Sequence, residues 1–254
     1  MFRFSVLSSG SKGNCIYVES PGSRILIDAG LSQKELTARL QAIGRAPEDV
    51  DAVFLTHEHS DHVKGLGPVT RKYRLPVYGT AGTHQETGKQ NIADRRVLKP
   101  SCRVMIGDLC VEAYATPHDA AEPVAFVIGC GNRKLGHATD LGSVTPLVRE
   151  KLKNADALLL EANHDVEMLD AGAYPWALKR RIKSDLGHLS NEACADLLSA
   201  VNHDGLQTVV LMHLSEKNNH PAIAEVTVRQ SLQRSSADMI LARQDRPTDL
   251  LAIR

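Results

Sequence analysis

The chain has 254 residues, of which 43% are hydrophobic and 24% charged. This balance is typical of a folded globular protein and excludes a disordered, collagen-like or coiled-coil chain. Thirty Lys and Arg residues balance thirty Asp and Glu residues, so no overall positive charge attracts nucleic acid. Any contact with nucleic acid must therefore come from a local patch.

Targeting signals are missing from the sequence pattern. No run of apolar residues is long enough for a membrane span, and the N-terminal segment lacks a signal-peptide pattern. The five cysteines are odd in number and show no CxxC spacing. This argues against both a disulfide framework and a Cys-rich zinc site. We therefore expect a cytoplasmic protein with no membrane partner.

The first third of the chain alternates short apolar runs with Gly/Ser turns. Ser32 is a candidate N-cap for a helix in which Leu36, Leu40 and Ile43 recur at helical spacing. The predicted elements are strands at Arg3–Leu7, Cys15–Glu19 and Arg24–Asp28, a helix at Gln33–Ile43, a strand at Asp51–Thr56, a helix at Val69–Tyr73 and a strand at Pro76–Tyr78.

The second half begins with three strand-like runs and then alternates strands with helices. The predicted strands are Cys110–Ala115, Pro123–Ile128, Lys134–Thr139, Ala155–Glu161, Gln207–His213, Met239–Leu241 and Leu250–Ile253. The predicted helices are Thr145–Leu152, Ala177–Leu186, Asn191–Val201, with Ser190 as its N-cap, and Ile223–Leu232. This order predicts an α/β (α+β) fold with two packed sheets and outer helices, in a single domain over residues 1–254.

The most informative motif is THEHSDH, which follows the strand DAVFL. If the backbone stays extended, His57, His59 and Asp61 project to one side, and His62 starts the next turn. Three imidazoles and a carboxylate are a metal-ligand set of nitrogen and oxygen type. Ligands this close together suit two adjacent ions better than one. The alternative is a surface loop that happens to be rich in histidine.

Further ligands are expected at the ends of later strands. His118 and Asp140 follow predicted strands and His213 ends one, and such ends deliver polar side chains to one rim. His137 competes with His118, but its odd separation from Asp140 places the two on opposite faces of a strand. We therefore expect His118 to be the ligand and His137 to be a sheet-surface histidine.

These motifs resemble the metallo-β-lactamase-fold hydrolases. The resemblance rests on ILIDAG, THEHSDH, ATDLG, MHLSEKNN and His118, and spans residues 5 to 218. Within that superfamily, SSGSKGNC, TPHDAAEPVAF, EANHD and HLSEKNN look like the YycJ (WalJ)-type subgroup, which is regarded as exonuclease-like.

The resemblance implies an αββα sandwich of two mixed β-sheets flanked by helices, with two metal ions at one edge. The implied ligands are His57, His59 and His118 for the first ion, Asp61, His62 and His213 for the second, and Asp140 between them. Asp28 would orient a ligand through hydrogen bonds. The alternative for Asp28 is an aspartate that only shapes the D-A-G turn.

The implied chemistry is hydrolysis without a protein nucleophile, and no GxSxG motif is present. Two divalent ions ~3.5–4 Å apart hold an attacking hydroxide between them and stabilise the oxygens of a phosphodiester displacement. Zn²⁺ and Mn²⁺ both fit a donor set without cysteine. Asp61 is a catalytic candidate as a ligand. His188, which resembles the histidine-before-helix segment of tRNase Z, and His164 are candidates to protonate the leaving group, with His220 a further one.

Substrate contacts are harder to assign. Asn14 is a candidate donor to a substrate oxygen. It ends a Gly/Ser loop that either exposes backbone N–H groups to a phosphate or forms a plain β-turn. Lys217 and His220 follow His213 and are candidate substrate residues. The run Lys179–Lys183 contains four cations that either receive a polyanion or form a solvated helix face.

The leading functional prediction is a dinuclear-metal phosphodiesterase that hydrolyses nucleic acid, as a DNA exonuclease. A small phosphodiester, thioester or lactone hydrolase is the alternative, and the basic run favours phosphate substrates. A metal-stabilised binding module without catalysis is the third possibility, and the presence of both Asp61 and Asp140 argues against it.

Overall fold

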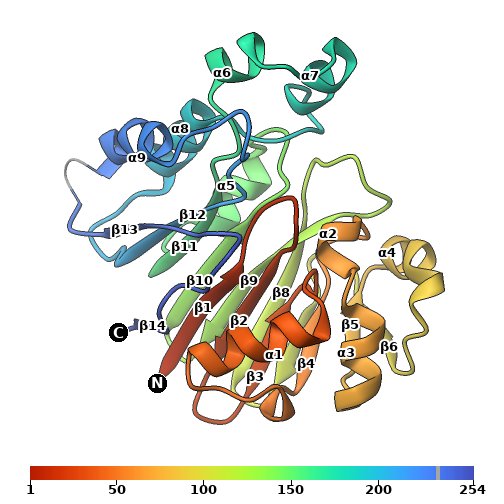
Figure 1. The fold of residues 1–254 in the computed structure, drawn as a ribbon. Helices are drawn as coiled ribbons and strands as arrows, with labels where there is room; N and C mark the ends of the chain where they lie inside the picture. The colour runs from red at the N-terminus through yellow and green to blue at the C-terminus, as the bar shows by residue number, and fades with distance from the viewer. Residues whose placement is uncertain (233–234) are drawn as a thin grey trace. The chain divides into compact units, whose positions relative to one another are not determined.

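The computed structural model describes residues 1–232 and 235–254 and contains two mixed β-sheets flanked by helices (Figure 1). The chain divides into two compact units. The first comprises Met1–Ala115, Ala120–Arg133 and Ala242–Arg254, and the second Thr116–Asp119 and Lys134–Leu241. The expectation of one domain over residues 1–254 stays a prediction.

The first sheet lies wholly in the first unit, in the order β14-β1-β2-β3-β4-β5-β6. Its strands are β1 (Phe2–Ser8), β2 (Cys15–Glu19), β3 (Arg24–Ile27), β4 (Ala52–Phe54), β5 (Val77–Gly79), β6 (Arg95–Val97) and β14 (Leu251–Ile253). The pairs from β14 to β3 are antiparallel, and those from β3 to β6 are parallel. The THEHSDH motif directly follows β4, which belongs to the parallel half of this sheet.

The second sheet has strands in both units. The first unit holds the antiparallel strands β7 (Arg103–Ile106), β8 (Leu109–Ala115) and β9 (Val124–Cys130). Within this unit, Phe54 of β4 stacks on Tyr78 with ring centroids 4.7 Å apart and meets Phe126 of β9 edge-on at 5.7 Å. These buried aromatic rings pack the inner faces of the two sheets against each other.

Helices cover the outer face of the first sheet. Ser32 and Glu35 form a capping box that starts α1 (Gln33–Ala42), and Leu36 and Leu40 bury its inner face against β3 and β4. The other helical elements of this unit are η1 (Pro47–Asp49), α2 (Ser60–Val63), α3 (Leu66–Tyr73), α4 (Ala81–Glu86) and η2 (Thr87–Gln90).

The second unit contains four parallel strands in the order β10-β11-β12-β13. They are β10 (Arg133–Ala138), β11 (Ala157–Glu161), β12 (Thr208–Met212) and β13 (Asp238–Leu241). The helical elements are α5 (Pro146–Leu152), α6 (Val166–Ala171), α7 (Trp176–Ile182), α8 (Asn191–Val201), α9 (Pro221–Arg229) and η3 (Gln230–Leu232). Figure 1 shows α8 and α9 together above β12 and β13, whereas α6 and α7 extend away from the strands.

The predicted elements are largely confirmed, with some corrections. Residues Cys15–Glu19 and Asn191–Val201 form the strand and helix expected, and Ser190 caps the helix by accepting a hydrogen bond from the Ala193 N–H. The extended backbone expected through Asp61 is wrong, because α2 already begins at Ser60. The helix expected to reach Leu186 ends at Ile182.

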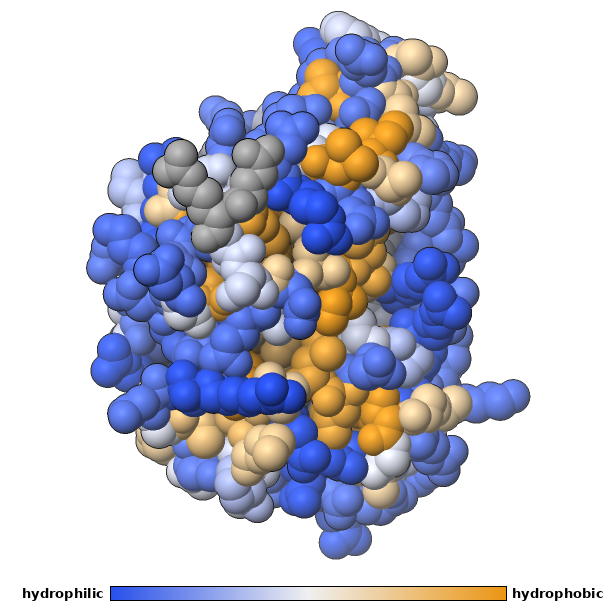
Figure 2. Space-filling model, turned by 90° about the vertical axis from the view of Figure 1, so that its left-hand side faces the viewer, coloured by the Kyte–Doolittle hydropathy of each residue, from blue (hydrophilic) through white to orange (hydrophobic). Residues whose placement is uncertain are grey.

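The surface drawn in Figure 2 is mostly hydrophilic, with smaller hydrophobic patches between polar side chains. Among residues 1–232 and 235–254, every helix is too short or too polar to cross a membrane.

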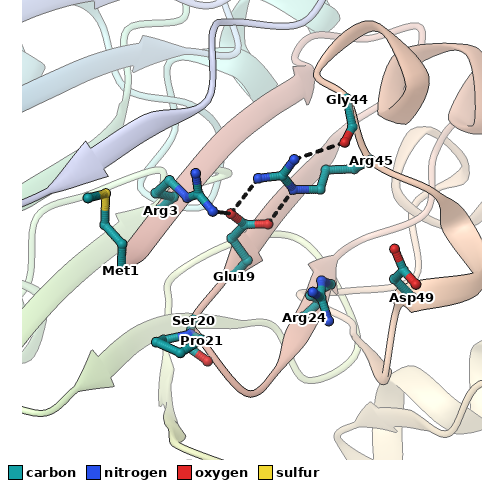
Figure 3. Close-up of a pocket in the computed structure, with 9 residues that line it drawn as sticks. All are labelled: Met1, Arg3, Glu19, Ser20, Pro21, Arg24, Gly44, Arg45 and Asp49. Carbon is teal, nitrogen blue, oxygen red and sulfur yellow. Dashed lines mark hydrogen bonds and ion pairs between the residues drawn. The ribbon is translucent and has the colours of Figure 1, made fainter.

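A buried carboxylate ties the start of β1 to the segment after α1 (Figure 3). Glu19 is 2% exposed and accepts a hydrogen bond from Arg45 Nε at 2.6 Å, while Arg3 lies 2.5 Å away. It also accepts a hydrogen bond from Tyr17 Oη at 2.8 Å. Burial opposes the charged form, but the hydrogen bonds from Arg45 and Tyr17 outweigh it and lower the pKa of Glu19.

Replacing this carboxylate tests its contribution to stability. We expect Glu19→Gln to lower the free energy of unfolding by about 2 kcal/mol at neutral pH, because the hydrogen bonds to charged groups weaken. Since the pKa of Glu19 is lowered in the folded state, the carboxylate stabilises the fold above the unfolded pKa, and this stabilisation is lost as pH falls through the folded pKa. Urea unfolding at several pH values should therefore show the two proteins converging in acid. A constant difference at all pH values would contradict the assignment.

Candidate metal centre

The first cluster of candidate ligands lies where β4 ends in the first unit. His57 and His62 are each 1% exposed, and their ring centroids lie 4.1 Å apart. The His59 ring lies 4.5 Å from that of His57. His59 is the N-cap residue of α2, so Asp61 and His62 stand in its first turn. The short helix gathers side chains that an extended strand would have spread along the edge.

Asp28 fixes the orientation of this cluster. Its Oδ2 atom lies 2.7 Å from His62 Nδ1 and accepts a hydrogen bond from Thr56 Oγ1 at 2.8 Å, while Oδ1 accepts one from the Thr56 N–H at 2.9 Å. Because a carboxylate only accepts, His62 Nδ1 must carry the proton. The lone pair of the neutral ring is then on Nε2, the form that binds a metal ion.

Asn14 braces the same cluster from the loop after β1. Its Nδ2 donates to Asp61 Oδ2 at 3.0 Å and lies 3.0 Å from His62 Nε2. Its Oδ1 accepts a hydrogen bond from the Gly10 N–H at 2.8 Å. A Cβ at Gly30 would lie 1.7 Å from the Asp61 carbonyl oxygen, so only glycine permits this approach. Asn14 is therefore a positioning residue for Asp61 and His62.

The second cluster lies at the ends of β10, β11 and β12 in the second unit. His213 Nδ1 lies 3.2 Å from Asp140 Oδ1 and 3.1 Å from Glu161 Oε1. His118 Nδ1 donates to the Gly187 carbonyl at 3.0 Å, since a carbonyl oxygen only accepts. In both rings the proton is on Nδ1 and the lone pair on Nε2, as at His62.

Glu161 is the member of the second cluster that the sequence analysis missed as a site residue. It is fully buried at the end of β11, and its Oε1 lies 2.7 Å from His188 Nδ1. Its Oε2 accepts a hydrogen bond from the Leu141 N–H at 2.9 Å. One atom from each of Asp140, Glu161, His188 and His213 lies within 4.8 Å of the others. The available signal was an acidic residue at the end of the apolar run ALLLE.

Glu161 and His188 perturb each other electrostatically. Burial opposes the charged form of Glu161, but the nearby His188 outweighs it and lowers the pKa of Glu161. Burial likewise opposes protonation of His188, but the charge and hydrogen bond of Glu161 raise its pKa. The pair therefore favours a carboxylate facing a protonated imidazole.

A cavity of about 190 Å³ opens beside His188. Its lining includes His164, which is 2% exposed, and Lys183. Burial lowers the pKa of His164, which favours the neutral ring. The Asn191 N–H donates to the His164 carbonyl at 2.9 Å and so joins this residue to the start of α8.

Three site residues have a left-handed backbone. Asp28, Asp140 and His213 have φ angles of 62°, 55° and 57°. This conformation is uncommon for residues other than glycine and costs about 1–2 kcal/mol in an ordinary L-residue. Each residue lies one or two positions after the end of a strand. The left-handed turn there changes the chain direction, so the side chain does not follow the alternation of the strand.

The other predicted residues lie in different settings. His137 is buried on β10, with Nε2 3.0 Å from Thr139 Oγ1, and so does not lie on the sheet surface. The exposed His220 caps α9, and its Nδ1 accepts a hydrogen bond from the Ala222 N–H at 3.3 Å. The Lys217 ammonium lies 5.6 Å from the centroid of the Tyr174 ring.

The basic run on α7 is mostly engaged within the second unit. Lys179 is 9% exposed and donates to the Asp170 carbonyl at 2.7 Å, and Lys183 donates to the Asp170 carboxylate at 2.8 Å. Arg181 pairs with Asp119. Three of the four cations that were expected either to receive a polyanion or to form a solvated helix face therefore have partners within the second unit.

The donor chemistry of both clusters fits divalent metal ions. The imidazoles of His62, His118 and His213 each have Nδ1 bound to an oxygen acceptor, which leaves Nε2 as the donor nitrogen. Carboxylates of Asp61 and Asp140 supply oxygen donors within the same clusters. Such a set suits Zn²⁺ or Mn²⁺.

Comparisons with known proteins agree with this chemistry. A family model described as the beta-lactamase superfamily domain matches residues 23–214. Exodeoxyribonuclease WalJ of Streptococcus pneumoniae serotype 2 is 39% identical over 237 residues, which cover 91% of this chain and 88% of that protein. Exodeoxyribonuclease YycJ of Bacillus anthracis is 41% identical over 235 residues, which cover 91% and 89%.

A solved structure confirms the fold. The metallo-beta-lactamase fold protein YhfI from Bacillus subtilis aligns with a TM-score of 0.76 over 98% of this chain and 100% of that one, at 17% identity. The expected fold of two mixed sheets flanked by helices is thereby confirmed. The chain belongs to the beta-lactamase superfamily and, within its metallo-β-lactamase-fold members, to the YycJ (WalJ)-like group.

Proposed function

We propose that this protein is a cytoplasmic metal-dependent phosphodiesterase that hydrolyses nucleic acid, as a DNA exonuclease. The observation that carries the proposal is the identity of 39–41% over about nine-tenths of the chain with proteins named exodeoxyribonucleases. The two His/Asp clusters supply the donor atoms that such an activity needs.

The proposed ligands follow the family resemblance residue by residue. We propose that His57, His59 and His118 hold one divalent ion, that Asp61, His62 and His213 hold a second, and that Asp140 is shared. Either Zn²⁺ or Mn²⁺ suits these donors. When bound, the two ions would activate a water molecule and neutralise charge on the phosphodiester.

The chain's own residues would orient these ligands and move the proton. Asp28 holds His62, and Glu161 holds both His213 and His188. His188 Nδ1 is bound by Glu161, so Nε2 is the atom that would protonate the leaving oxygen. His164 lines the same cavity and is the alternative proton donor. Asn14 holds Asp61, and Lys217 and His220 remain candidate substrate contacts.

A small phosphodiester, thioester or lactone is the alternative substrate class. A panel of end-labelled single- and double-stranded DNA and RNA, incubated with Mn²⁺ or Zn²⁺, separates the two. We expect stepwise shortening of DNA from an end. Hydrolysis of a small chromogenic phosphodiester without cleavage of any nucleic acid would favour the alternative.

The number of ions is directly measurable. We expect two divalent ions per chain in protein purified without chelators, because the donor set exceeds what one tetrahedral ion uses. Elemental analysis of the native protein gives the count, and removal by chelation should abolish hydrolysis. A stoichiometry of one ion in fully active protein would contradict the dinuclear proposal.

Asp61 offers a test of the ligand assignment. We expect Asp61→Ala to reduce hydrolysis about a hundredfold or more, because loss of a metal ligand raises the activation barrier by roughly 3 kcal/mol. Its side chain is 20% exposed, so the fold should persist. Asp49→Ala, which replaces an exposed aspartate on η1 of the same unit, is the matched control. Retention of most of the wild-type rate at saturating metal would exclude the role.

Asp28 tests how ligand orientation is achieved. We expect Asp28→Asn to weaken metal affinity about 10–100-fold, because an amide no longer fixes the proton on His62 Nδ1 as a carboxylate does. Asparagine also tolerates the left-handed backbone at this position. Competition with a fluorescent chelator measures the affinity, with Asp51→Asn as control. Unchanged affinity would mean that Asp28 only shapes its turn.

A further inference from the structure

The chain contains a single tryptophan, and it is exposed. Trp176 is the first residue of α7 and is 68% exposed. Among the described residues, its indole makes no aromatic contact and no hydrogen bond. A large ring left open to water on a helix beside the site is an unusual use of the chain's only tryptophan.

Basic side chains continue from Trp176 along one face of α7. Arg180 and Lys183 lie four and seven residues after Trp176, which places all three on the same side of the helix. We call Trp176, Arg180 and Lys183 the α7 face. Arg180 is exposed and has no hydrogen bond or ion pair within residues 1–232 and 235–254. Lys183 is bound to Asp170, so Arg180 is the cation that remains open on this face.

The opposite face of α7 is anchored. Leu178 and Ile182 are half-buried on that face. The buried Lys179, which lies at the edge of the α7 face, donates to the Asp170 carbonyl. Residues 176–182 include no acidic side chain; the acidic residues of this region lie on α6 and in the loop after α7. The helix is therefore held in place by its buried side, while the Trp176 ring and the Arg180 guanidinium face the solvent.

The α7 face leads to the cavity beside His188. The His188 N–H donates to the Ile182 carbonyl at 2.9 Å, and Lys183 lines the same cavity as His188. A Cβ at Gly187 would lie 2.1 Å from the Ile182 carbonyl oxygen, so only glycine lets the loop return this closely to the helix. From Trp176 to Lys183 the helix rises about 10 Å, at 1.5 Å per residue.

An exposed ring followed by an open guanidinium has the chemistry that binds a nucleic-acid strand. Bases stack on aromatic rings irrespective of sequence, and arginine contacts the phosphates between them. A rise of about 10 Å corresponds to roughly three nucleotides at 3.4 Å per step. The positive charge of the face complements the backbone that such a strand would bring.

We propose that the α7 face binds the nucleic-acid strand, with a base stacked on Trp176 and a backbone phosphate on Arg180, a few nucleotides from the scissile bond. This inference rests on the proposed function and adds a substrate-contact surface to it. It implies that a strand must extend a few nucleotides beyond the reacting phosphodiester to gain the full contact.

Fluorescence of the single tryptophan can report directly on stacking of a base against Trp176. The metal-loaded wild-type protein is titrated with a phosphorothioate oligodeoxynucleotide of about twelve residues while indole emission and the anisotropy of a labelled copy are recorded. We expect saturable quenching that follows binding. An abasic oligonucleotide of the same length, which offers phosphates but no bases, should bind more weakly and leave emission almost unchanged. Binding without quenching by the normal oligonucleotide would overturn the stacking.

Variants separate the ring from the charge. We expect Trp176→Ala to weaken oligonucleotide binding about tenfold and Trp176→Phe to retain most of it. Arg180→Gln should weaken binding and reduce the salt dependence of affinity, whereas Arg149→Gln, which removes a charge from the exposed side of α5, should do neither. Wild-type affinity in both Trp176→Ala and Arg180→Gln would refute the proposal.

Three further measurements distinguish the possible failures. Hydrolysis of a small chromogenic phosphodiester should be unchanged in Trp176→Ala, because that substrate is too short to reach α7. If the wild type cleaves DNA but the variants cleave it equally well, the α7 face is not the binding surface, although the proposed function stands. If no nucleic acid is cleaved, the proposed function itself fails. Emission that depends on protein concentration without DNA would instead assign this face to contact with a second copy.

Discussion

The second unit depends on one buried carboxylate. Glu161 has no exposed surface, and it receives His188 and His213 on one oxygen and the Leu141 N–H on the other. These partners come from three separate segments that follow β10, β12 and α7. A buried charge needs several donors to offset the loss of water, and here two of the donors are the candidate site residues His188 and His213. The same hydrogen bonds therefore stabilise the buried charge of Glu161 and orient the side chains of the candidate site.

In the first unit, Asp28 is the buried carboxylate that orients a candidate ligand. Its carboxylate lies between Thr56 and His62 and determines which ring nitrogen carries the proton. A histidine can offer either nitrogen, and the choice changes the direction of the donor lone pair. In both units an acceptor behind the ring makes that choice, by a carboxylate at His62 and His213 and by a carbonyl at His118. The orientation of these candidate ligands is thus set by the protein itself.

Local patterns in the sequence were sufficient for most of the fold. The Ser32 and Ser190 caps and the apolar runs identified helices and strands because those signals act within a few residues. The THEHSDH motif identified the donor-rich segment for the same reason. The four-residue α2 was missed because a single turn gives no periodicity to detect. As a result, the side of the chain on which Asp61 lies was derived from the wrong backbone.

Contacts between distant residues were beyond the sequence pattern. Glu161 acquires its role from partners 27 and 52 residues away, and Arg181 pairs with Asp119, 62 residues earlier. No spacing rule connects such positions without a structure. In the sequence, the four cations of α7 and its C-terminal end could not be distinguished from one another. In the structure, Lys179, Arg181 and Lys183 have partners, whereas Arg180 stays open to solvent. The sequence identifies side chains that could bind metal or substrate. The long-range contacts of the fold determine which of them are already engaged by other residues.

The left-handed backbone at Asp28, Asp140 and His213 has an evolutionary consequence. At each position, glycine would relieve conformational strain while removing the side chain that belongs to the candidate site. A selection for thermal stability alone and a selection for activity alone would therefore drive these three positions toward different residues. A descendant of this chain that kept the fold but no longer needed its chemistry would be recognisable by glycine or asparagine there, with the surrounding strands unaltered.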